Sequence, residues 1–138
     1  MSYKQTNKVF FLVHKMESDI AGTQYDVAHV ILGVDWRMPI INQFKEQLEN
    51  CDNEWTTLNG VKGCKFTSKQ KGNSIFLPVA GGRRYGKPIN IGMYGHYRSS
   101  TQYPSKSSRS FGLNFQRTNV ERNYYLRFLG LSIRPVSK

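Results

Sequence analysis

The sequence of 138 residues lacks a long hydrophobic run. Val9–Val13 has five apolar residues in succession, whereas a membrane-spanning helix needs about 20. This run is followed by His14, Lys15 and Glu17 rather than by the small residues of a signal-peptide cleavage site. We therefore expect no membrane insertion, and we interpret Val9–Val13 as a strand and residues 1–8 as a frayed end.

Cysteine is also scarce, and Cys51 and Cys64 are the two in the chain. A disulfide requires Cα atoms within about 7 Å of each other, which their separation in the sequence does not establish. We expect two buried free thiols, with a disulfide as the alternative.

Acidic residues are almost missing from the second half of the chain. Residues 1–61 carry five Lys or Arg and eight Asp or Glu, a net charge of −3. Residues 62–138 carry fifteen Lys or Arg and one acid, Glu121, a net charge of +14, and the two halves account for the +11 of the whole chain. Cations with so few carboxylates nearby create a positive potential that attracts anionic partners. An ordinary solvated basic surface is the alternative.

The shortage of acids and the positions of the histidines argue against metal binding and catalysis. Calcium needs several oxygen ligands, some of them charged, and Glu121 alone does not supply them. His14, His29 and His96 have no nearby carboxylate or nucleophile pattern, and no Gly-rich phosphate loop is present. We therefore expect no enzyme, no metal and no cofactor.

The first half of the chain predicts two helices followed by a hairpin. Asp26 is a suitable N-cap for a helix that ends at Gly33. Pro39 suits the first turn of a second helix, whose apolar residues recur on one face. Asn59-Gly60 is a turn dipeptide between two strands. The apolar face comprises Ile40, Ile41, Phe44 and Leu48, and core positions are also expected for Trp36 and Trp55.

A short apolar strand lies near the middle of the chain. Ile75–Val79 is almost wholly apolar, which predicts a strand buried on both faces. Pro78 cannot donate a hydrogen bond to a sheet, so the strand should end there, and Gly81-Gly82 permits a sharp turn. This turn should bring Arg83-Arg84 to the surface.

The remainder of the chain predicts loops with short strands. Residues 87–104 combine glycine, proline, serine and tyrosine without a helical period, which is typical of binding loops. Phe111, Leu113 and Phe115 alternate with polar residues and predict a strand with one buried face. Apolar residues between positions 124 and 136 predict the last strands, with a bulge at Gly130.

Four motifs occur in order along the chain: Trp36-Arg37-Met38-Pro39, Asn59-Gly60-Val61-Lys62-Gly63, Gly72–Arg83 and Gly130–Val136. Together they resemble the Fibrobacter succinogenes major paralogous domain family of Bacteroidetes-type bacteria. That family is related to the C-terminal domain of a Legionella collagen-like adhesin and is similar to C-type-lectin-like folds. The resemblance implies a single α+β domain over residues 1–138, with two helices packed on short antiparallel sheets and a loop-rich binding region at residues 83–129. It does not imply an enzyme.

One position departs from the family pattern. Members usually carry tryptophan in a Tyr-Trp-Ser-Ser motif, where this chain has Tyr97-Arg98-Ser99-Ser100. The departure predicts a weaker structural role for Arg98, and it places a cation beside His96 and Tyr97.

We predict a non-enzymatic recognition or adhesion domain that displays a basic, tyrosine-rich surface. Arginine forks bind sulfate, carboxylate and phosphate groups, and tyrosine supplies flat contact area at low entropic cost. The expected ligand is an acidic or sulfated glycan or an acidic protein surface. The candidate ligand-binding residues are Arg83, Arg84, Tyr85, Lys87, His96, Tyr97, Arg98, Arg109, Arg117, Arg122, Tyr124, Tyr125 and Arg127.

Other functions are compatible with the same residues. The chain would also suit a structural decoration or assembly domain, such as a homotrimer, whose basic face docks onto an acidic partner subunit. Nonspecific nucleic-acid binding is favoured by charge and aromatic residues, but no recognised motif is present. The family resemblance favours display on a cell surface or a phage virion over a cytoplasmic location.

The resemblance also implies a form of sequence diversification. Some relatives of C-type-lectin-like folds are the displayed targets of diversity-generating retroelements, with variable positions in the last third of the chain. Asn119–Leu129 lies where such variation would fall, and its mixture of Asn, Tyr, Leu, Arg and Phe is compatible with it. A diversified receptor-binding protein is thus one form of the predicted function.

Overall fold

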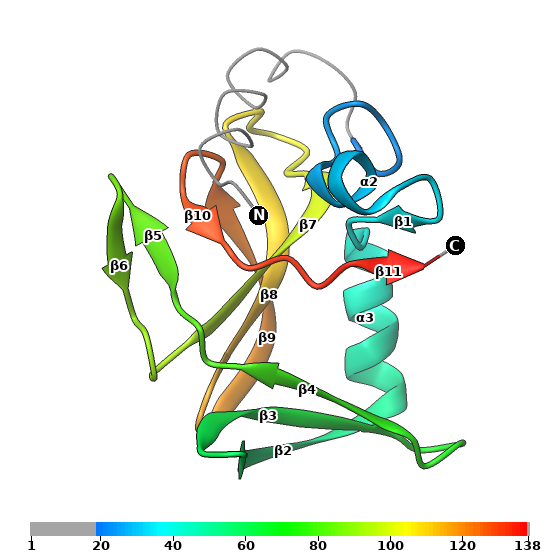
Figure 1. Ribbon diagram of the computed structural model, residues 1–138, viewed down its shortest axis with the longest axis vertical. Helices are drawn as coiled ribbons and strands as arrows, with labels where there is room; N and C mark the ends of the chain where they lie inside the picture. The colour runs from blue at the N-terminus through cyan, green and yellow to red at the C-terminus, as the bar shows by residue number, and fades with distance from the viewer. Residues whose placement is uncertain (1–18, 138) are drawn as a thin grey trace.

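The computed structural model describes residues 19–137 (Figure 1). Over these residues the chain forms two helices and several short antiparallel sheets, which confirms the α+β prediction. The predicted strand Val9–Val13 and the frayed residues 1–8 lie outside the described residues.

Helix α2 (Val27–Leu32) is fixed at its start by a buried carboxylate. One oxygen of Asp26 accepts hydrogen bonds from two backbone N–H groups of the first turn, at 2.9 and 3.1 Å. The other oxygen accepts from the backbone N–H groups of Gly22 and Met38, at 2.8 and 2.9 Å. Asp26 therefore caps the helix and also holds the segments on either side of it. The predicted helix between Asp26 and Gly33 is confirmed.

Helix α3 (Ile41–Asn50) carries the apolar face that was predicted for it. Pro39 lies buried one residue before the N-cap, outside the first turn that was predicted for it. Phe44 is 3 % exposed and belongs to the main core, and Ile41 and Leu48 pack against that core from the same helix. Ile40 precedes α3 as its N-cap, and its backbone N–H donates to the Gln43 side chain at 2.9 Å.

Strand β1 (Trp36–Arg37) and strand β11 (Val136–Ser137) form a two-stranded antiparallel sheet at the surface. Trp36 lies opposite Ser137 and is 40 % exposed. The predicted core position of Trp36 is wrong, because this small sheet does not bury it. Trp55 does pack against the main core.

The first three-stranded sheet has the order β2-β3-β4 and comprises β2 (Cys51–Leu58), β3 (Val61–Ser68) and β4 (Ser74–Pro78). Asn59 and Gly60 join β2 to β3 with positive φ angles of 51° and 80°, which suits a tight hairpin turn. The predicted hairpin is therefore confirmed.

Strand β4 ends at Pro78, as predicted, but it is an edge strand. Leu77 is 1 % exposed, whereas Ile75 and Phe76 are only partly buried. The predicted burial on both faces is therefore wrong. An apolar run at a sheet edge leaves part of its surface outside the core.

The second three-stranded sheet has the order β7-β8-β9 and comprises β7 (Gly95–Gln102), β8 (Arg109–Gln116) and β9 (Asn119–Leu126). These strands occupy much of residues 83–129, so the prediction of a loop-rich region there is wrong. Residues 87–104 do combine loops with strands, as predicted, but β7 is longer than the short strands expected. The strand predicted around Phe111–Phe115 is confirmed as β8. Because β8 is central, polar residues on its second face, such as Ser110 and Asn114, are buried too.

The main core lies between α3 and these two sheets, which Figure 1 shows on adjacent sides of the helix. Phe44 of α3 packs with Phe66 of β3, Leu77 of β4 and Phe115 of β8. The rings of Phe66 and Phe115 meet edge to face with centroids 6.2 Å apart, a favourable aromatic geometry. A smaller cluster of Ile20, Val27, Ala28 and Met38 fixes α2.

The third three-stranded sheet carries a projecting hairpin. Its order is β10-β5-β6, with β5 (Gly82–Arg84), β6 (Lys87–Ile89) and β10 (Gly130–Leu131). Figure 1 shows the β5–β6 hairpin standing away from the helices, on the far left of the molecule. Arg83 and Arg84 are exposed on it, as the turn at Gly81-Gly82 predicted. Gly130, where a bulge was predicted, begins β10.

Both cysteines are free, as expected. Cys51 lies opposite Ser68 in the β2–β3 pair, and Cys64 lies opposite Trp55. Cys64 is 2 % exposed, whereas Cys51 is half-buried.

Candidate functional site

Five of the thirteen predicted ligand-binding residues lie in the interior. His96, Tyr97, Arg98, Tyr125 and Arg127 are each 9 % exposed or less. The prediction that they form part of an exposed binding surface is wrong. Each of them is held by the fold for a different physical reason.

Arg98 is a structural residue of β7, with 2 % of its surface exposed. Its guanidinium donates hydrogen bonds to the hydroxyl of Ser110 and to the carbonyls of Leu126 and Leu129, the latter two at 3.1 and 2.8 Å. These carbonyls lie at the end of β9 and in the turn that follows it, so Arg98 fastens that turn to the sheet. The predicted weak structural role of Arg98 is wrong.

His96 lies in a buried polar network. Its Nε2 is 3.1 Å from the amide nitrogen of Asn90, and its Nδ1 is 3.1 Å from the hydroxyl of Tyr125. A neutral imidazole fits both contacts, because Nε2 then accepts from the amide and Nδ1–H donates to the hydroxyl. Burial lowers the pKa of His96 below its usual 6.5, partly opposed by a hydrogen bond with Asn114. Burial likewise raises the pKa of Tyr125.

Tyr97 and Arg127 are also held inside the fold. The hydroxyl of Tyr97 donates to the carbonyl of Pro78 at 2.8 Å, and its ring stacks on Phe115 in the main core. Arg127 donates to the side chain of Gln102 at 3.3 Å. Burial lowers the pKa of Arg127.

The remaining predicted residues form two exposed groups and one isolated position. Arg117 is isolated, because it lies at the β8–β9 turn, whereas Arg109 starts β8 at the opposite end. Seven residues of extended chain separate the two ends of β8, or about 24 Å. The predicted single binding surface is therefore wrong, since the structure divides it.

The first group, the hairpin cluster, consists of Arg83, Arg84, Tyr85, Lys87 and Phe128. Tyr85 at the tip is 79 % exposed and has a φ of 50°, a left-handed conformation that a tyrosine rarely adopts. Its ring stacks on Phe128 with centroids 5.5 Å apart, and the Arg84 guanidinium lies 5.5 Å from the ring centre. Arg83 donates to the carbonyl of Gly86 at 3.2 Å. These contacts give the tip a defined shape.

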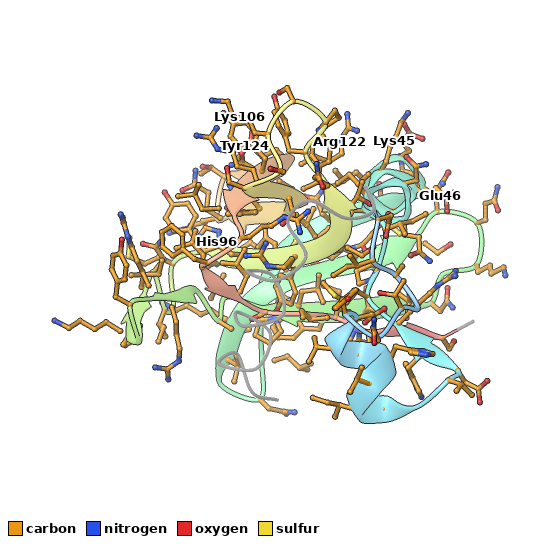
Figure 2. All side chains as sticks on the ribbon, turned by 90° about the horizontal axis from the view of Figure 1, so that it is seen from above. Lys45, Glu46, His96, Lys106, Arg122 and Tyr124 are labelled. Atoms are coloured by element: carbon orange, nitrogen blue, oxygen red, sulfur yellow. The ribbon has the colours of Figure 1, made fainter. Side chains whose placement is uncertain are left out.

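The second group, the sheet cluster, consists of Tyr103, Lys106, Arg109, Arg122 and Tyr124. The rings of Tyr103 and Tyr124 lie 4.6 Å apart, and the Arg109 guanidinium lies 5.0 Å from the centre of the Tyr124 ring. Figure 2 shows Lys106, Tyr124 and Arg122 on the same side of the molecule, with Lys45 and Glu46 further along that side and His96 inside.

Three of these residues, Tyr103, Lys106 and Phe128, are not among the thirteen predicted ones, and for the last two the sequence holds no signal. Phe128 was interpreted as part of a final strand, although its spacing from Tyr85 gives no signal that the two rings meet. Lys106 lies in the turn before β8, and its position beside the cluster depends on the β7–β8 pairing. Neither residue belongs to a motif that would have identified it.

The arginines of both clusters, three of them exposed and Arg109 half-buried, have no carboxylate partner among the described residues. Among residues 19–137, none of Arg83, Arg84, Arg109 and Arg122 forms an ion pair with an acidic side chain. Their positive charge is therefore available to an external anion. No group of three His, Cys, Asp or Glu side chains in this part of the chain is placed to hold a metal ion.

Neither described helix is both long and apolar enough to cross a lipid bilayer. Comparison of the chain with models of protein families, with curated proteins and with solved structures gave no match.

Proposed function

We propose that this chain is a non-enzymatic recognition domain that binds an acidic ligand through the hairpin cluster. One observation carries the proposal. Arg83, Arg84 and Lys87 are exposed on one short hairpin, and no carboxylate among residues 19–137 neutralises them. Charge-assisted hydrogen bonds from guanidinium groups to carboxylate or sulfate are stronger than those between neutral groups. A glycan or a protein surface rich in such groups is the fitting ligand class.

Tyr85 supports the same proposal. The hairpin projects from the body of the molecule (Figure 1). Tyr85 lies in its turn, between β5 and β6. A ligand that reaches Arg84 would therefore touch the ring that lies against it. A rigid aromatic side chain supplies contact area with little loss of conformational entropy.

The proposal includes the family and the fold that the sequence motifs indicate. Membership of the Fibrobacter succinogenes major paralogous domain family and a C-type-lectin-like fold are supported by the four sequence motifs. Diversification at Asn119–Leu129 is supported by β9, an edge strand with exposed Arg122 and Tyr124. Display on a cell surface or a virion follows from the same resemblance.

A second candidate function is assembly onto an acidic partner subunit. Ile91 and Met93, in the segment that follows β6, are each 63 % exposed. Large apolar side chains close in sequence to a basic hairpin favour a protein partner over a carbohydrate, because their burial adds hydrophobic free energy.

The test is binding to heparin, a sulfated polyanion, by isothermal titration calorimetry. The double variant Arg83→Glu/Arg84→Glu should bind at least about tenfold more weakly, because charge-assisted hydrogen bonds contribute about 1.5 kcal/mol or more each. The matched control is Lys69→Glu/Lys71→Glu, which makes the same change of net charge in the exposed loop between β3 and β4. The heparin affinity of this control should stay close to that of the parent protein.

An equal loss of heparin affinity in both double variants would show that binding follows net charge alone, and it would overturn the hairpin site. Absence of heparin binding by the parent protein at low salt would reject polyanion recognition and favour assembly. In that case, light scattering should reveal a stable oligomer or complex that persists at high salt.

A further inference from the structure

One arrangement of side chains occurs twice on the surface. In each case an arginine guanidinium lies over a tyrosine ring, and that ring contacts a second aromatic ring. Both arrangements are exposed at least in part. The hairpin stack is Arg84–Tyr85–Phe128, and the sheet stack is Arg109–Tyr124–Tyr103.

Stacking prepares each guanidinium for an anion. A guanidinium held against an aromatic ring has lost part of its rotational freedom before any ligand arrives. Its N–H groups project from the edge of the plane, where they match the two oxygens of a carboxylate or sulfate. Neither Arg84 nor Arg109 uses these groups in an ion pair within residues 19–137. Each stack is thus a preorganised anion receptor.

The two stacks are joined by a short piece of backbone. Tyr124 of the sheet stack and Phe128 of the hairpin stack are four residues apart, so their Cα atoms are separated by at most about 14 Å. The intervening turn is held in place by Arg98, which donates to the carbonyls of Leu126 and Leu129. The spacing of the stacks is therefore fixed by the fold.

We propose that both stacks bind one linear acidic polysaccharide at the same time, each holding one carboxylate or sulfate group. This inference rests on the proposed function, because it extends the hairpin site to a second receptor on the same ligand. Once one group is bound, the second binds as an intramolecular event at high effective concentration. Affinity should therefore depend on ligand length.

The stacks suit a polysaccharide better than a single-stranded nucleic acid. Nucleic-acid recognition of this kind relies on bases that stack on free aromatic faces. Tyr85 and Tyr124 each already carry both a ring contact and a guanidinium. The groups left to meet a ligand are guanidinium edges and phenolic hydroxyls, which recognise oxyanions and sugar hydroxyls.

The experiment is calorimetry with heparin oligosaccharides of defined length, from a disaccharide to chains longer than the separation of the stacks. The parent protein should bind the long chains about 10² to 10⁴ times more tightly than the disaccharide. Arg84→Ala and Arg109→Ala should each reduce long-chain affinity to near the disaccharide level. Arg117→Ala makes an equal change of charge at the remote β8–β9 turn and serves as the control. It should retain the higher affinity for long chains.

The outcomes separate this inference from the proposed function. If affinity does not depend on length while Arg83→Glu/Arg84→Glu still weakens binding, two-point binding is wrong and the hairpin site stands. If no oligosaccharide binds, the proposed function itself fails. If single-stranded DNA or polyglutamate of matched charge binds as tightly as the long oligosaccharide, the assignment to a polysaccharide is wrong. Thermal unfolding of each variant verifies that the fold is retained.

Discussion

At the scale of single residues, burial decides which arginines serve the fold and which are available to a ligand. Arg98 and Arg84 have the same side chain, but Arg98 is 2 % exposed and bonded to backbone carbonyls, whereas Arg84 is exposed on a hairpin. Counting basic residues in the sequence does not distinguish the two. The exposed position of Arg84 was predictable because the adjacent glycine turn is a local signal.

Replacement of Arg98 by alanine should destabilise the protein strongly. The carbonyls of Leu126 and Leu129 and the hydroxyl of Ser110 would lose a charged donor inside the fold. We expect the free energy of unfolding to fall by about 3 kcal/mol or more, measured by urea denaturation. Arg84→Ala should change it by less than about 0.5 kcal/mol. Equal effects of the two substitutions would contradict the structural role of Arg98.

At the scale of elements, the sequence predicted correctly those helix starts, turns and strand ends that depend on adjacent residues. The Asp26 cap, the Asn59-Gly60 turn and the end of β4 at Pro78 each depend on a few adjacent positions. Strand β7 was not predictable in this way, because its polar side chains find partners far away in the sequence. Ser100 donates to Asp19, 81 positions earlier, and Arg98 reaches Leu129, 31 positions later.

The candidate site shows the same division. The exposed Arg83-Arg84 pair followed from the turn before it, whereas the meeting of Tyr85 with Phe128 depends on the pairing of β5 with β10. Pairings between distant segments have no local signature in a single sequence. The prediction of a single basic, tyrosine-rich surface failed for this reason, since β8 separates Arg117 from Arg109 by its full length.

The stability of the protein should depend on pH through His96. This side chain joins β7 to Tyr125 of β9 and to Asn90 in the segment after β6. Its folded-state pKa lies below the usual 6.5, so the unfolded chain binds the proton more readily. The stability contributed by neutral His96 is present above about pH 6.5 and is lost as the pH falls toward the folded-state pKa. The charged or titratable groups around it are Tyr94, whose ring stacks on His96, then Tyr125, Arg98, and Glu121, which accepts a hydrogen bond from Asn114.

We therefore expect the free energy of unfolding to decrease between about pH 7.5 and about pH 5.5, measured by urea denaturation. His96→Gln should flatten this part of the curve. A slope that survives in His96→Gln would assign the pH dependence to another group.

At the scale of the whole molecule, the labelling rates of the two cysteines distinguish local exposure from global unfolding. Cys64 is 2 % exposed, and burial raises its pKa to about 11, so its reactive thiolate is rare in the folded protein. Cys51 is half-buried at the start of β2. Iodoacetamide should therefore label Cys51 first in native buffer, and Cys64 only as urea unfolds the chain.

Mass spectrometry of the labelled peptides measures both rates in one sample. The Cys64 rate should rise with the fraction unfolded, because that side chain belongs to the main core. A reducing agent should leave the melting temperature unchanged, since both thiols are free. Equal labelling of the two cysteines without urea would show that β3 opens separately from the rest of the core.

The pairing of β1 with β11 has a practical consequence for measurements on a sensor chip. It holds Ser137, the last described residue, beside Trp36 on the side of α2 and α3, across the molecule from the β5–β6 hairpin (Figure 1). A biotin or affinity handle attached at Ser137 would therefore orient immobilised molecules with the hairpin toward the flowing solution. Coupling through lysine amines would instead consume Lys87 within the hairpin cluster.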